Sequence, residues 1–328
     1  MAKVIIIILN WNGWKDTIQC LESLMRSSYA DYRVVVCDND STDDSLKKIK
    51  AWASGELIVA DYLNDTLRRL LVPPLAKPLA YIEYDRETAE SGDHEQTDSF
   101  PLVLIQTGSN AGYAGGNNVG IRYALQQNAD YIWLLNNDTV ITRDTLAELV
   151  DFMATDNVMG LAGSVIYLAD QPERLQTYGG GRLARLFGTD RFVYTRGPID
   201  YVSGTSLFIR REVVETIGLL DETFFFYWED TDYSTRAKKK GWKLGTADSA
   251  IVYHRFSASV GGQSLKSDLF KVAAMTRYFK KHWRWVWFFP VMINVTGMIV
   301  KRFFRCQFTR IFPILKETLA SLRRHIAN

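Results

Sequence analysis

The chain has 328 residues, of which 47% are hydrophobic and 23% are charged. This composition is typical of a globular protein and excludes a largely disordered chain, and the length accommodates one large α/β domain with an appendage or two modest domains. The formal charge is only +2, and we expect no nucleic-acid partner. The three cysteines show no paired spacing, which favours a reducing compartment over a disulfide framework or a zinc ribbon.

The first fifty residues alternate between strand and helix patterns. Residues 4–9 are a continuous aliphatic run that is too short for a signal peptide, and residues 33–37 are a second such run. Residues 16–26 and 45–52 have the apolar spacing of helices. A β-α-β-α order predicts a doubly wound, mainly parallel sheet with helices on both faces.

The next stretch interrupts this alternation. Residues 55–100 contain Pro73, Pro74 and Pro78 and an acidic segment, and we interpret them as an insertion or flexible lobe. Beyond them the pattern predicts strands at 102–105, 131–136 and 160–167 and a helix at 144–154. A loop rich in glycine and asparagine, residues 110–120, is expected to lead into a helix that ends near Gln127.

Polar residues follow three of the predicted strands. They are Asn10, Trp11 and Asn12, then Asp38, Asn39 and Asp40, then Asn136, Asn137 and Asp138. Ligands of parallel α/β sheets bind beyond the carboxyl ends of the strands, so this pattern indicates one site at one sheet edge. For Asn137 or Asp138 the alternative is a helix cap before residue 144.

Two further features suggest a diphosphate and a metal at this edge. The turn at 115–118 contains Gly115, Gly116 and Asn117, and a glycine turn that opens a helix offers free amides to phosphate, although such turns are often purely structural. Carboxylates and a diphosphate repel each other unless a divalent cation such as Mg²⁺ or Mn²⁺ lies between them. Asp138 is the best candidate ligand and His254 a second, unless His254 is a structural residue of its strand.

Residues 224–233 combine five consecutive aromatic residues with the acids Glu229, Asp230 and Asp232. Aromatic rings stack on sugar rings, and a carboxylate at a helix start can act as a general base. The alternative is a core segment followed by helix N-terminal acids, and both interpretations can hold together.

These motifs together resemble the family 2 glycosyltransferases, and most closely the rhamnosyltransferase-like branch that builds surface polysaccharides. The resemblance covers residues 3–262 and rests on six ordered motifs, which include 203–205 and 228–232. It implies a GT-A fold, a nucleotide-sugar donor, a divalent cation and inversion at the anomeric carbon. We therefore expect a GT-A domain over 1–262, with the insertion at about 55–100, and a C-terminal helical region over 263–328.

The resemblance also implies roles for individual residues. Asp230 is similar to the catalytic base, with Glu229 as its neighbour, and Asp138 and His254 are similar to the metal ligands. Acceptor-binding positions would be Gly204, Trp228 and Asp232. Donor-binding positions would be Asn10, Trp11, Asn12, Asp38, Asn39, Asp40, Gly112, Gly115, Gly116, Asn117, Asn136 and Asn137. One departure is Asn136, which stands where the family's metal motif has its first acid and removes one formal charge.

The C-terminal residues carry most of the positive charge. From Arg277 onward there are eleven Lys or Arg and one acid, Glu317. Residues 285–300 lack charge but are a marginal length for a membrane span. Apolar residues then recur at helical spacing opposite basic ones, which favours docking on an anionic membrane surface, although a helix packed on the body or on a second subunit has the same pattern.

The sequence thus predicts an inverting glycosyltransferase that transfers a sugar from dTDP-rhamnose or a UDP-hexose to a glycan or lipid-linked acceptor. We expect it in the cytoplasm, peripheral at the inner face of the plasma membrane, and possibly as a homo-oligomer. Two other classes remain open. They are a catalytically silent protein that binds carbohydrate or nucleotide sugar, and a nucleotidyltransferase, which would release pyrophosphate.

Overall fold

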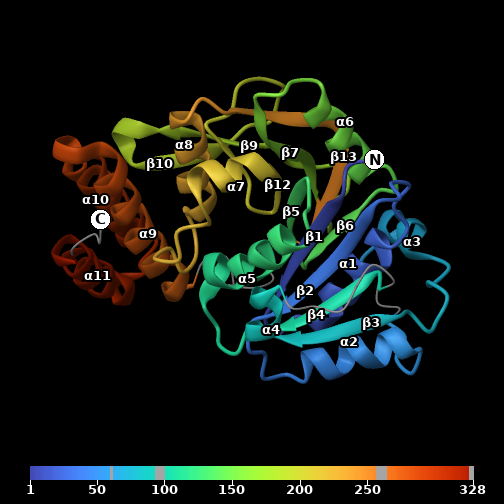
Figure 1. Cartoon of the computed structure of the whole chain (residues 1–328). Coiled ribbons are helices and arrows are strands. Elements are labelled where there is room, and N and C mark those ends of the chain that lie inside the picture. The colour runs from blue at the N-terminus through green and yellow to red at the C-terminus, as the bar shows by residue number, and fades with distance from the viewer. Residues whose placement is uncertain (60–61, 93–99, 256–263, 325–328) are drawn as a thin grey trace.

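The computed structural model describes residues 1–59, 62–92, 100–255 and 264–324. Its centre is a ten-stranded sheet in the order β3-β4-β2-β1-β5-β12-β7-β13-β6, with β8 paired to β7 (Figure 1). The strands are β1 (Val4–Asn10), β2 (Tyr32–Asp38), β3 (Tyr81–Asp85), β4 (Leu102–Gln106), β5 (Tyr131–Asn136), β6 (Thr139–Ile141), β7 (Met159–Leu168), β8 (Leu175–Tyr178), β12 (Ser206–Arg210) and β13 (Lys243–His254). A smaller sheet contains β9 (Gly180–Ala184), β10 (Thr189–Phe192) and β11 (Tyr201–Val202).

The sheet changes direction at β5. From β3 to β5 all neighbours are parallel, whereas β12 runs antiparallel to β5, with Ser206 opposite Leu135. The start of β12 therefore lies at the same edge as the carboxyl end of β5. This arrangement brings the loop before β12, which contains Gly204, next to the polar residues that follow β5.

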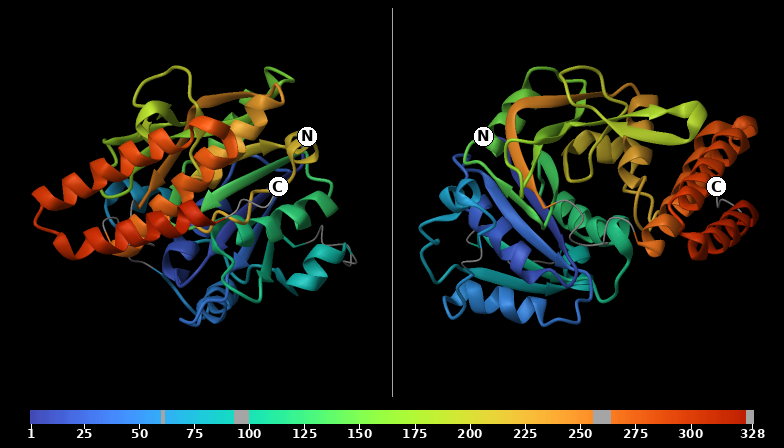
Figure 2. Two further views of the ribbon diagram at one scale, coloured as in Figure 1. Left: turned by 90° about the vertical axis from the view of Figure 1, so that its left-hand side faces the viewer. Right: turned by 180° about the vertical axis from the view of Figure 1, so that it is seen from behind.

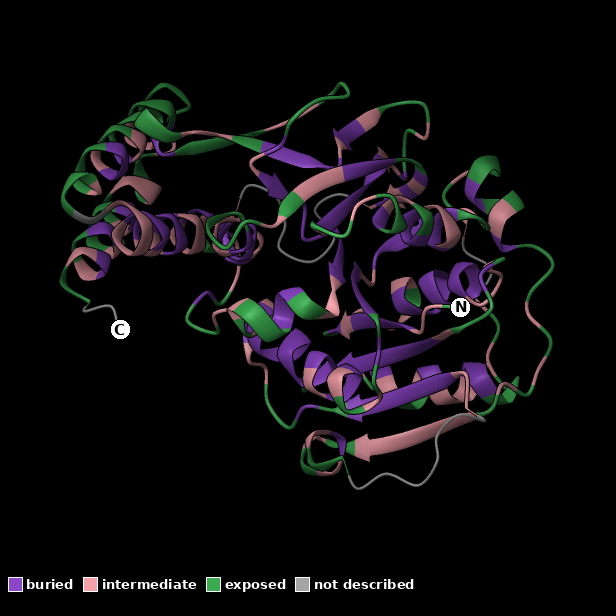
Figure 3. Ribbon diagram, turned by 45° about the horizontal axis from the view of Figure 1, so that its top comes forward, coloured by how far each residue is buried: buried purple, intermediate pink, exposed green. Residues whose placement is uncertain are grey.

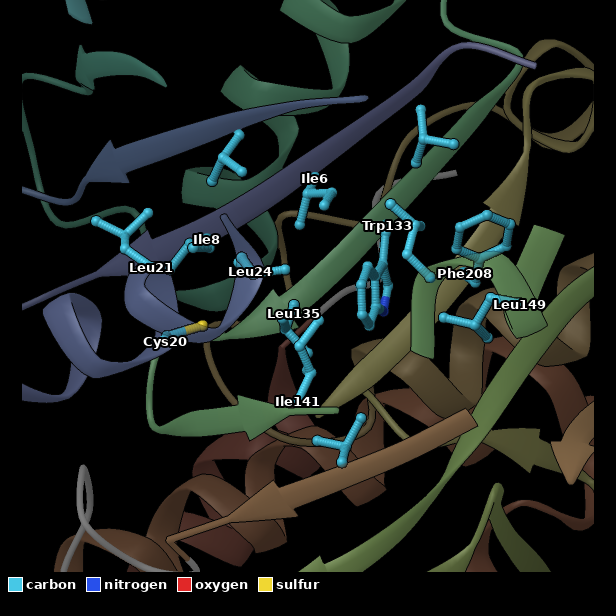
Figure 4. Packing of buried hydrophobic residues seen from close by; sticks show 14 of the residues in the cluster. Ile6, Ile8, Cys20, Leu21, Leu24, Trp133, Leu135, Ile141, Leu149 and Phe208 are labelled. Atoms are coloured by element: carbon cyan, nitrogen blue, oxygen red, sulfur yellow. The ribbon is translucent and has the colours of Figure 1, made fainter. Parts of the chain in front are cut away.

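Helices cover both faces of the sheet because its strands alternate apolar side chains to each side. The bounds are α1 (Trp14–Leu24), α2 (Ser45–Ser54), α3 (Asp65–Leu71), α4 (Arg86–Ser91), α5 (Gly112–Gln126), α6 (Thr145–Ala154), α7 (Arg211–Ile217) and α8 (Glu229–Lys239). Ile6, Ile8 and Trp133 pack with Leu21 and Leu24 of α1 on one face (Figure 4). On the other face, Ile5 and Ile7 belong to a core with residues of α4, α5, α7 and α8.

Two expectations differ from the structure. The interval 55–100, expected as an insertion or lobe, contains α3, α4 and the edge strand β3, which pairs in parallel with β4. The helix expected after a glycine-rich loop begins earlier, at Gly112, so Gly115, Gly116 and Asn117 lie inside its first turns rather than in a turn before it.

The chain ends in three helices, α9 (Leu265–Trp283), α10 (Phe288–Phe304) and α11 (Ile311–Arg323), which group at one side of the molecule (Figure 2). Their inner faces share a core with Phe224 and Trp228 of the preceding segment. The outer faces of α10 and α11 are exposed (Figure 3). None of the described helices is both long and apolar enough to cross a membrane. The expected boundary at residue 262 lies outside the described residues, and the division into two regions stays a prediction.

Candidate active site

Asp138 lies in the tight turn between β5 and β6, and it caps no helix. The helix that follows, α6, begins at Thr145 after Asp144, so the helix-cap alternative is wrong. Thr139 Oγ donates a hydrogen bond to the carbonyl of Asn136 and closes the turn. Asp138 is 8% exposed, and its Oδ1 accepts no hydrogen bond from any described residue.

His254 reaches Asp138 through strand pairing. β13 runs antiparallel to β6 with His254 opposite Thr139, and this register places His254 Nε2 3.2 Å from Asp138 Oδ1. On the other side of the ring, Nδ1 lies 2.9 Å from Oε1 of the buried Gln176. The His254 ring therefore lies between the Gln176 amide and the Asp138 carboxylate, with Nε2 on the carboxylate side.

Asp138 and His254 thus bring one carboxylate and one imidazole together in a buried position. A divalent cation takes carboxylate oxygen and imidazole nitrogen as ligands, and Mg²⁺ and Mn²⁺ keep remaining positions for phosphate and water. No group of three or more His, Cys, Asp or Glu suited to a metal occurs in the described part of the chain. Asp138 and His254 therefore fit such an ion as a two-residue site that a diphosphate must complete.

Glu229 and Asp230 begin α8 and are turned into a cleft by two residues with unusual backbone angles. Tyr227 and Trp228 have φ values of 71° and 68°, a left-handed conformation that costs free energy for large side chains and concentrates at functional sites. Trp228 is then buried against Tyr278 and Phe279 of α9, with ring centroids 4.9 and 5.8 Å apart. Packing of the C-terminal helices thus holds the strained turn.

Asp230 is held in place by backbone amides. Its Oδ2 accepts a hydrogen bond of 2.8 Å from Gly204 N, and its Oδ1 accepts one of 2.6 Å from Thr231 N. A Cβ on Gly204 would lie 3.4 Å from both Asp230 Oδ2 and the Tyr113 hydroxyl, in ordinary van der Waals contact. The Tyr113 hydroxyl in turn donates to the Gly204 carbonyl at 2.6 Å.

Burial shifts both carboxyl groups toward the protonated form. It raises the pKa of Asp230 to about 6, against the opposing effect of the Gly204 and Thr231 amides. For Glu229, burial and then the charge of Asp230 raise the pKa well above the usual range, and Oε2 of Glu229 has no hydrogen-bond partner. Asp230 therefore ionises before Glu229 and has a pKa suited to accept a proton near neutral pH.

A cleft of about 640 Å³ brings these groups together. Its walls include Asn136, Asp138, His254, Gly204, Trp228, Glu229 and Asp230 of the predicted residues, together with residues of α9 and α10. One cavity thus contains the predicted metal ligands, the Glu229-Asp230 pair and two of the predicted acceptor positions.

Asp232 lies elsewhere. Its side chain is fully buried and pairs with Arg236 at 2.8 Å, Lys281 at 2.9 Å and His282 at 2.7 Å. Burial alone would raise the pKa of Asp232, but the His282 hydrogen bond and the two cations lower it to about 2. The structure therefore does not bring Asp232 together with the other predicted acceptor positions, because its side chain is buried and joins α8 to α9. The acceptor-binding role of Asp232 stays a prediction.

The residues after β1 and β2 form a separate polar network at the same sheet edge. Asn10 Nδ2 donates to Asp38 Oδ1 at 2.6 Å, and Asp38 also accepts from the hydroxyl and amide of Ser41. Asn12 Oδ1 accepts from Thr42 N at 2.7 Å. These bonds fix two loops against each other, while Trp11, 42% exposed, and Asp40 remain at the surface.

Asn39 joins this network to the start of α5. Its Nδ2 donates to the carbonyl of Gly112 at 3.1 Å, and a Cβ on Gly116 would meet Leu9 and the Asn39 side chain. Gly112 has a φ of 72°. The Asn117 side chain bonds back to the Tyr113 carbonyl, and Asn137 donates to Thr17. The glycines thus permit close packing of α5 on the sheet, and the donor-binding roles of these residues stay predictions.

Several cleft residues gave no signal in the sequence. Gln176 and Tyr201 lie on short strands, and their neighbours His254 and Asp190 are distant in sequence. Lys271 of α9 and Lys301 of α10 also line the cleft, and no motif in the sequence marked them as site residues. The sequence shows that the C-terminal region is basic, but the contribution of that region to the cleft depends on long-range packing.

Two family models match the chain. Residues 131–321 match the model described as Glycosyl transferase family group 2, and residues 4–67 match Glycosyl transferase family 2. Since the first match alone covers more than half of the chain, the protein belongs to the family 2 glycosyltransferases. This confirms the resemblance noted in the sequence.

Among curated proteins, the chain is 29% identical over 161 residues to the low-salt glycan biosynthesis hexosyltransferase Agl10 of Haloferax volcanii. It is 28% identical over 184 residues to the dTDP-rhamnosyl transferase RfbF of Shigella flexneri. These matches cover 47% and 54% of this chain and 52% and 61% of the relatives. The similarity thus spans only part of each protein.

Two solved structures show the same fold. A mannosyltransferase from Pyrobaculum calidifontis aligns with a TM-score of 0.55 over 99% of this chain and 76% of its own, at 14% identity. GalNAc-T7 aligns with a TM-score of 0.59 over 87% of this chain and 49% of its own, at 15% identity. The fold is therefore GT-A, as expected.

Proposed function

We propose that the protein is an inverting glycosyltransferase that moves a sugar from a nucleotide-sugar donor to a hydroxyl group of an acceptor. The observation that carries this proposal is the shared cleft, in which Asp230 faces the same space as Asp138 and His254. A proton acceptor and a site for a metal-bound diphosphate are the two functions that a single displacement requires.

In this mechanism the Asp230 carboxylate removes the proton of the acceptor hydroxyl. The oxygen then bonds to the anomeric carbon while the bond from that carbon to the donor phosphate breaks, and the nucleoside diphosphate leaves. Backbone amides hold both oxygens of Asp230, so the base is oriented before the substrate arrives. Attack from the face opposite the leaving group inverts the anomeric configuration.

Asp138 and His254 would hold a divalent cation, which supplies positive charge to the departing diphosphate. Gln176 Oε1, 2.9 Å from Nδ1, orients the His254 ring with Nε2 toward Asp138. Support for a metal also comes from the mannosyltransferase and GalNAc-T7 structures, which are described as containing Mn²⁺. The polar loops of Asn10, Asn12 and Asp38 would bind the nucleoside.

For the donor we propose dTDP-rhamnose or a UDP-hexose, because two of the similar proteins are named a dTDP-rhamnosyl transferase and a hexosyltransferase. The acceptor would be a glycan or a lipid-linked glycan in surface polysaccharide synthesis. Over 72 residues the chain is also 35% identical to a Mycobacterium tuberculosis protein named N-acetylglucosaminyl-diphospho-decaprenol L-rhamnosyltransferase, whose acceptor is lipid-linked by name.

We propose further that α10 and α11 dock on an anionic membrane surface. Their outer faces expose Phe289 (66%), Phe304 (79%) and Phe312 (74%) beside the exposed basic residues Lys316 and Arg323. Exposed aromatic residues beside basic ones suit a membrane interface, where each basic residue adds about 1 kcal/mol. The location at the inner face of the plasma membrane stays a prediction.

Liposome flotation tests the docking. Phe304→Ser combined with Phe312→Ser should shift the protein from the floated to the soluble fraction on anionic vesicles. Ile58→Ser, a change at an equally exposed apolar residue far from these helices (73% exposed), should not. Equal flotation of the double variant and the parent would contradict membrane docking through these faces.

A donor panel tests the enzymatic proposal. Thermal unfolding is measured with dTDP-rhamnose and UDP-hexoses, with and without Mn²⁺, because a bound donor stabilises the fold by mass action. Products are then analysed with a glycan acceptor. Release of nucleoside diphosphate with sugar transfer supports the proposal, whereas release of pyrophosphate identifies a nucleotidyltransferase. Donor binding without transfer to any acceptor identifies a silent binding protein.

A further inference from the structure

The C-terminal helices form one wall of the cleft. Their contribution consists of Asp268, Lys271, Met275, Asn294, Met298, Lys301 and Arg302. None of these positions is needed by the base or by the metal ligands described above. A wall that combines cations and methionines beside Asp230 nevertheless faces the space that an acceptor must occupy.

Not every charged residue of this wall has an oppositely charged partner within the wall. Arg302 Nη2 pairs with Asp268 Oδ1 at 2.5 Å, and both side chains are buried. Lys271 and Lys301 form no ion pair with any described residue. Burial lowers the pKa of Lys271, Asp268 and Asp190 oppose this effect, and the nearby Arg302 and Lys301 add to it. Arg310 Nη1 also lies 3.5 Å from Asp268 Oδ2, so four cations share the neighbourhood of two carboxylates.

This group continues into an apolar surface. On α10, Asn294, Met298, Lys301 and Arg302 recur at helical spacing and face the cleft. On the adjoining face of the same helix, Val300 and Phe304 are 46% and 79% exposed. Lys301 thus lies between a polar cavity and the apolar outer face of α10.

We propose that Lys271 and Lys301 bind a phosphate or diphosphate group of the acceptor, and that an apolar chain attached to it leaves over Val300 and Phe304. The inference rests on the proposed function, and it narrows the acceptor to a sugar linked through phosphate to a lipid. Ammonium groups bind phosphate as point charges, and the half-buried Lys271 does so with less screening by solvent than the exposed Lys301.

The position of the lysines favours the acceptor over the donor. Both lie on helices that pack against Trp228 and the Glu229-Asp230 turn. The polar loops proposed for the nucleoside follow β1 and β2, and Figure 1 shows those strands in the central sheet, away from α9 and α10. The donor diphosphate is also accounted for by Asp138, His254 and the cation that they fit.

Calorimetry on the full chain separates the two sources of phosphate. Farnesyl diphosphate serves as the probe for a lipid-linked acceptor, and UDP with Mn²⁺ as the probe for the donor. Lys271→Met with Lys301→Met should weaken farnesyl diphosphate binding by about tenfold or more and change UDP binding by less than about twofold. Lys240→Met with Arg69→Met, which removes the same charge from exposed positions outside the cleft, should change neither.

A charge-preserving pair, Lys271→Arg with Lys301→Arg, should retain most farnesyl diphosphate binding, and thermal unfolding verifies that the methionine pair is folded. Equal weakening of both probes in the methionine pair would assign the lysines to the donor and overturn the inference. Unchanged farnesyl diphosphate binding, or none by the parent, would also overturn it. Failure of UDP to bind the parent would instead count against the proposed function.

Discussion

Replacing Asp232 with Asn should destabilise the protein without removing a substrate contact. The environment lowers the pKa of Asp232 from 3.8 to about 2, and at about 1.36 kcal/mol per unit this corresponds to about 2 kcal/mol of stability near neutral pH. The variant also leaves His282, Lys281 and Arg236 short of a buried counter-charge, a loss that reaches about 3–5 kcal/mol in other proteins.

Two of these cations keep other partners in the variant, so the expected loss in free energy of unfolding lies near the lower end of these values. Lys281 also pairs with Asp221 at 2.6 Å, and Arg236 also donates to the carbonyls of Ile217 and Leu219. We therefore expect Asp232→Asn to lower the free energy of unfolding by about 2–3 kcal/mol. Urea denaturation at pH 7 measures this change directly.

The matched control is Asp156→Asn, which breaks the exposed pair with Lys243 and should have a much smaller effect. The pH dependence gives a second check. Because the folded pKa of Asp232 is depressed, its contribution is present above about pH 4 and is lost as the pH falls toward 2. A variant as stable as the parent but with weakened acceptor binding would refute the structural role and support the acceptor role.

Three further outcomes are expected. Asp230→Asn should reduce transfer by about 10²–10⁴-fold with donor binding retained, and unchanged turnover would remove Asp230 from the role of base. Since burial raises the pKa of Asp230 to about 6, transfer by the parent should fall about tenfold per pH unit below that value; a profile flat from pH 7 to 5 would contradict this assignment. Asp138→Asn should abolish the Mn²⁺ dependence of UDP binding. Gln176→Leu should weaken Mn²⁺ affinity by about 10–100-fold, as measured by electron paramagnetic resonance. An unaltered Mn²⁺ affinity in both variants would place the metal elsewhere.

The parts of the fold that depend on local pattern were predictable from the sequence. The aliphatic runs of β1 and β2 are buried strands of a mainly parallel sheet, and the polar residues after them meet at its edge. Asp138 and His254 are both expected at strand ends of one edge, and their side chains lie 3.2 Å apart, while their role as metal ligands stays a prediction. In each of these cases the residue type and its place at a strand end carry the information.

The features that differ from expectation are set by distant contacts. Residues 55–100 lack the long apolar run of a central strand, yet β3 adds to the edge of the sheet, where half-buried side chains suffice. Asp232 looked like its neighbours Glu229 and Asp230, but the helical rotation between them turns it toward His282 on α9. Gln176 and Lys271 enter the cleft from elements whose positions no local pattern defines.

The sheet side and the α10 side of the cleft should tolerate substitutions to different extents. Asp138 lies in the turn after β5 and His254 ends β13, and both residues are buried, where few substitutions are tolerated. The α10 wall belongs to a helix whose outer face is largely exposed. Changes on α10 can therefore accumulate over generations with little effect on the sheet, and a duplicated copy of the gene can acquire a new acceptor while it keeps its sugar donor.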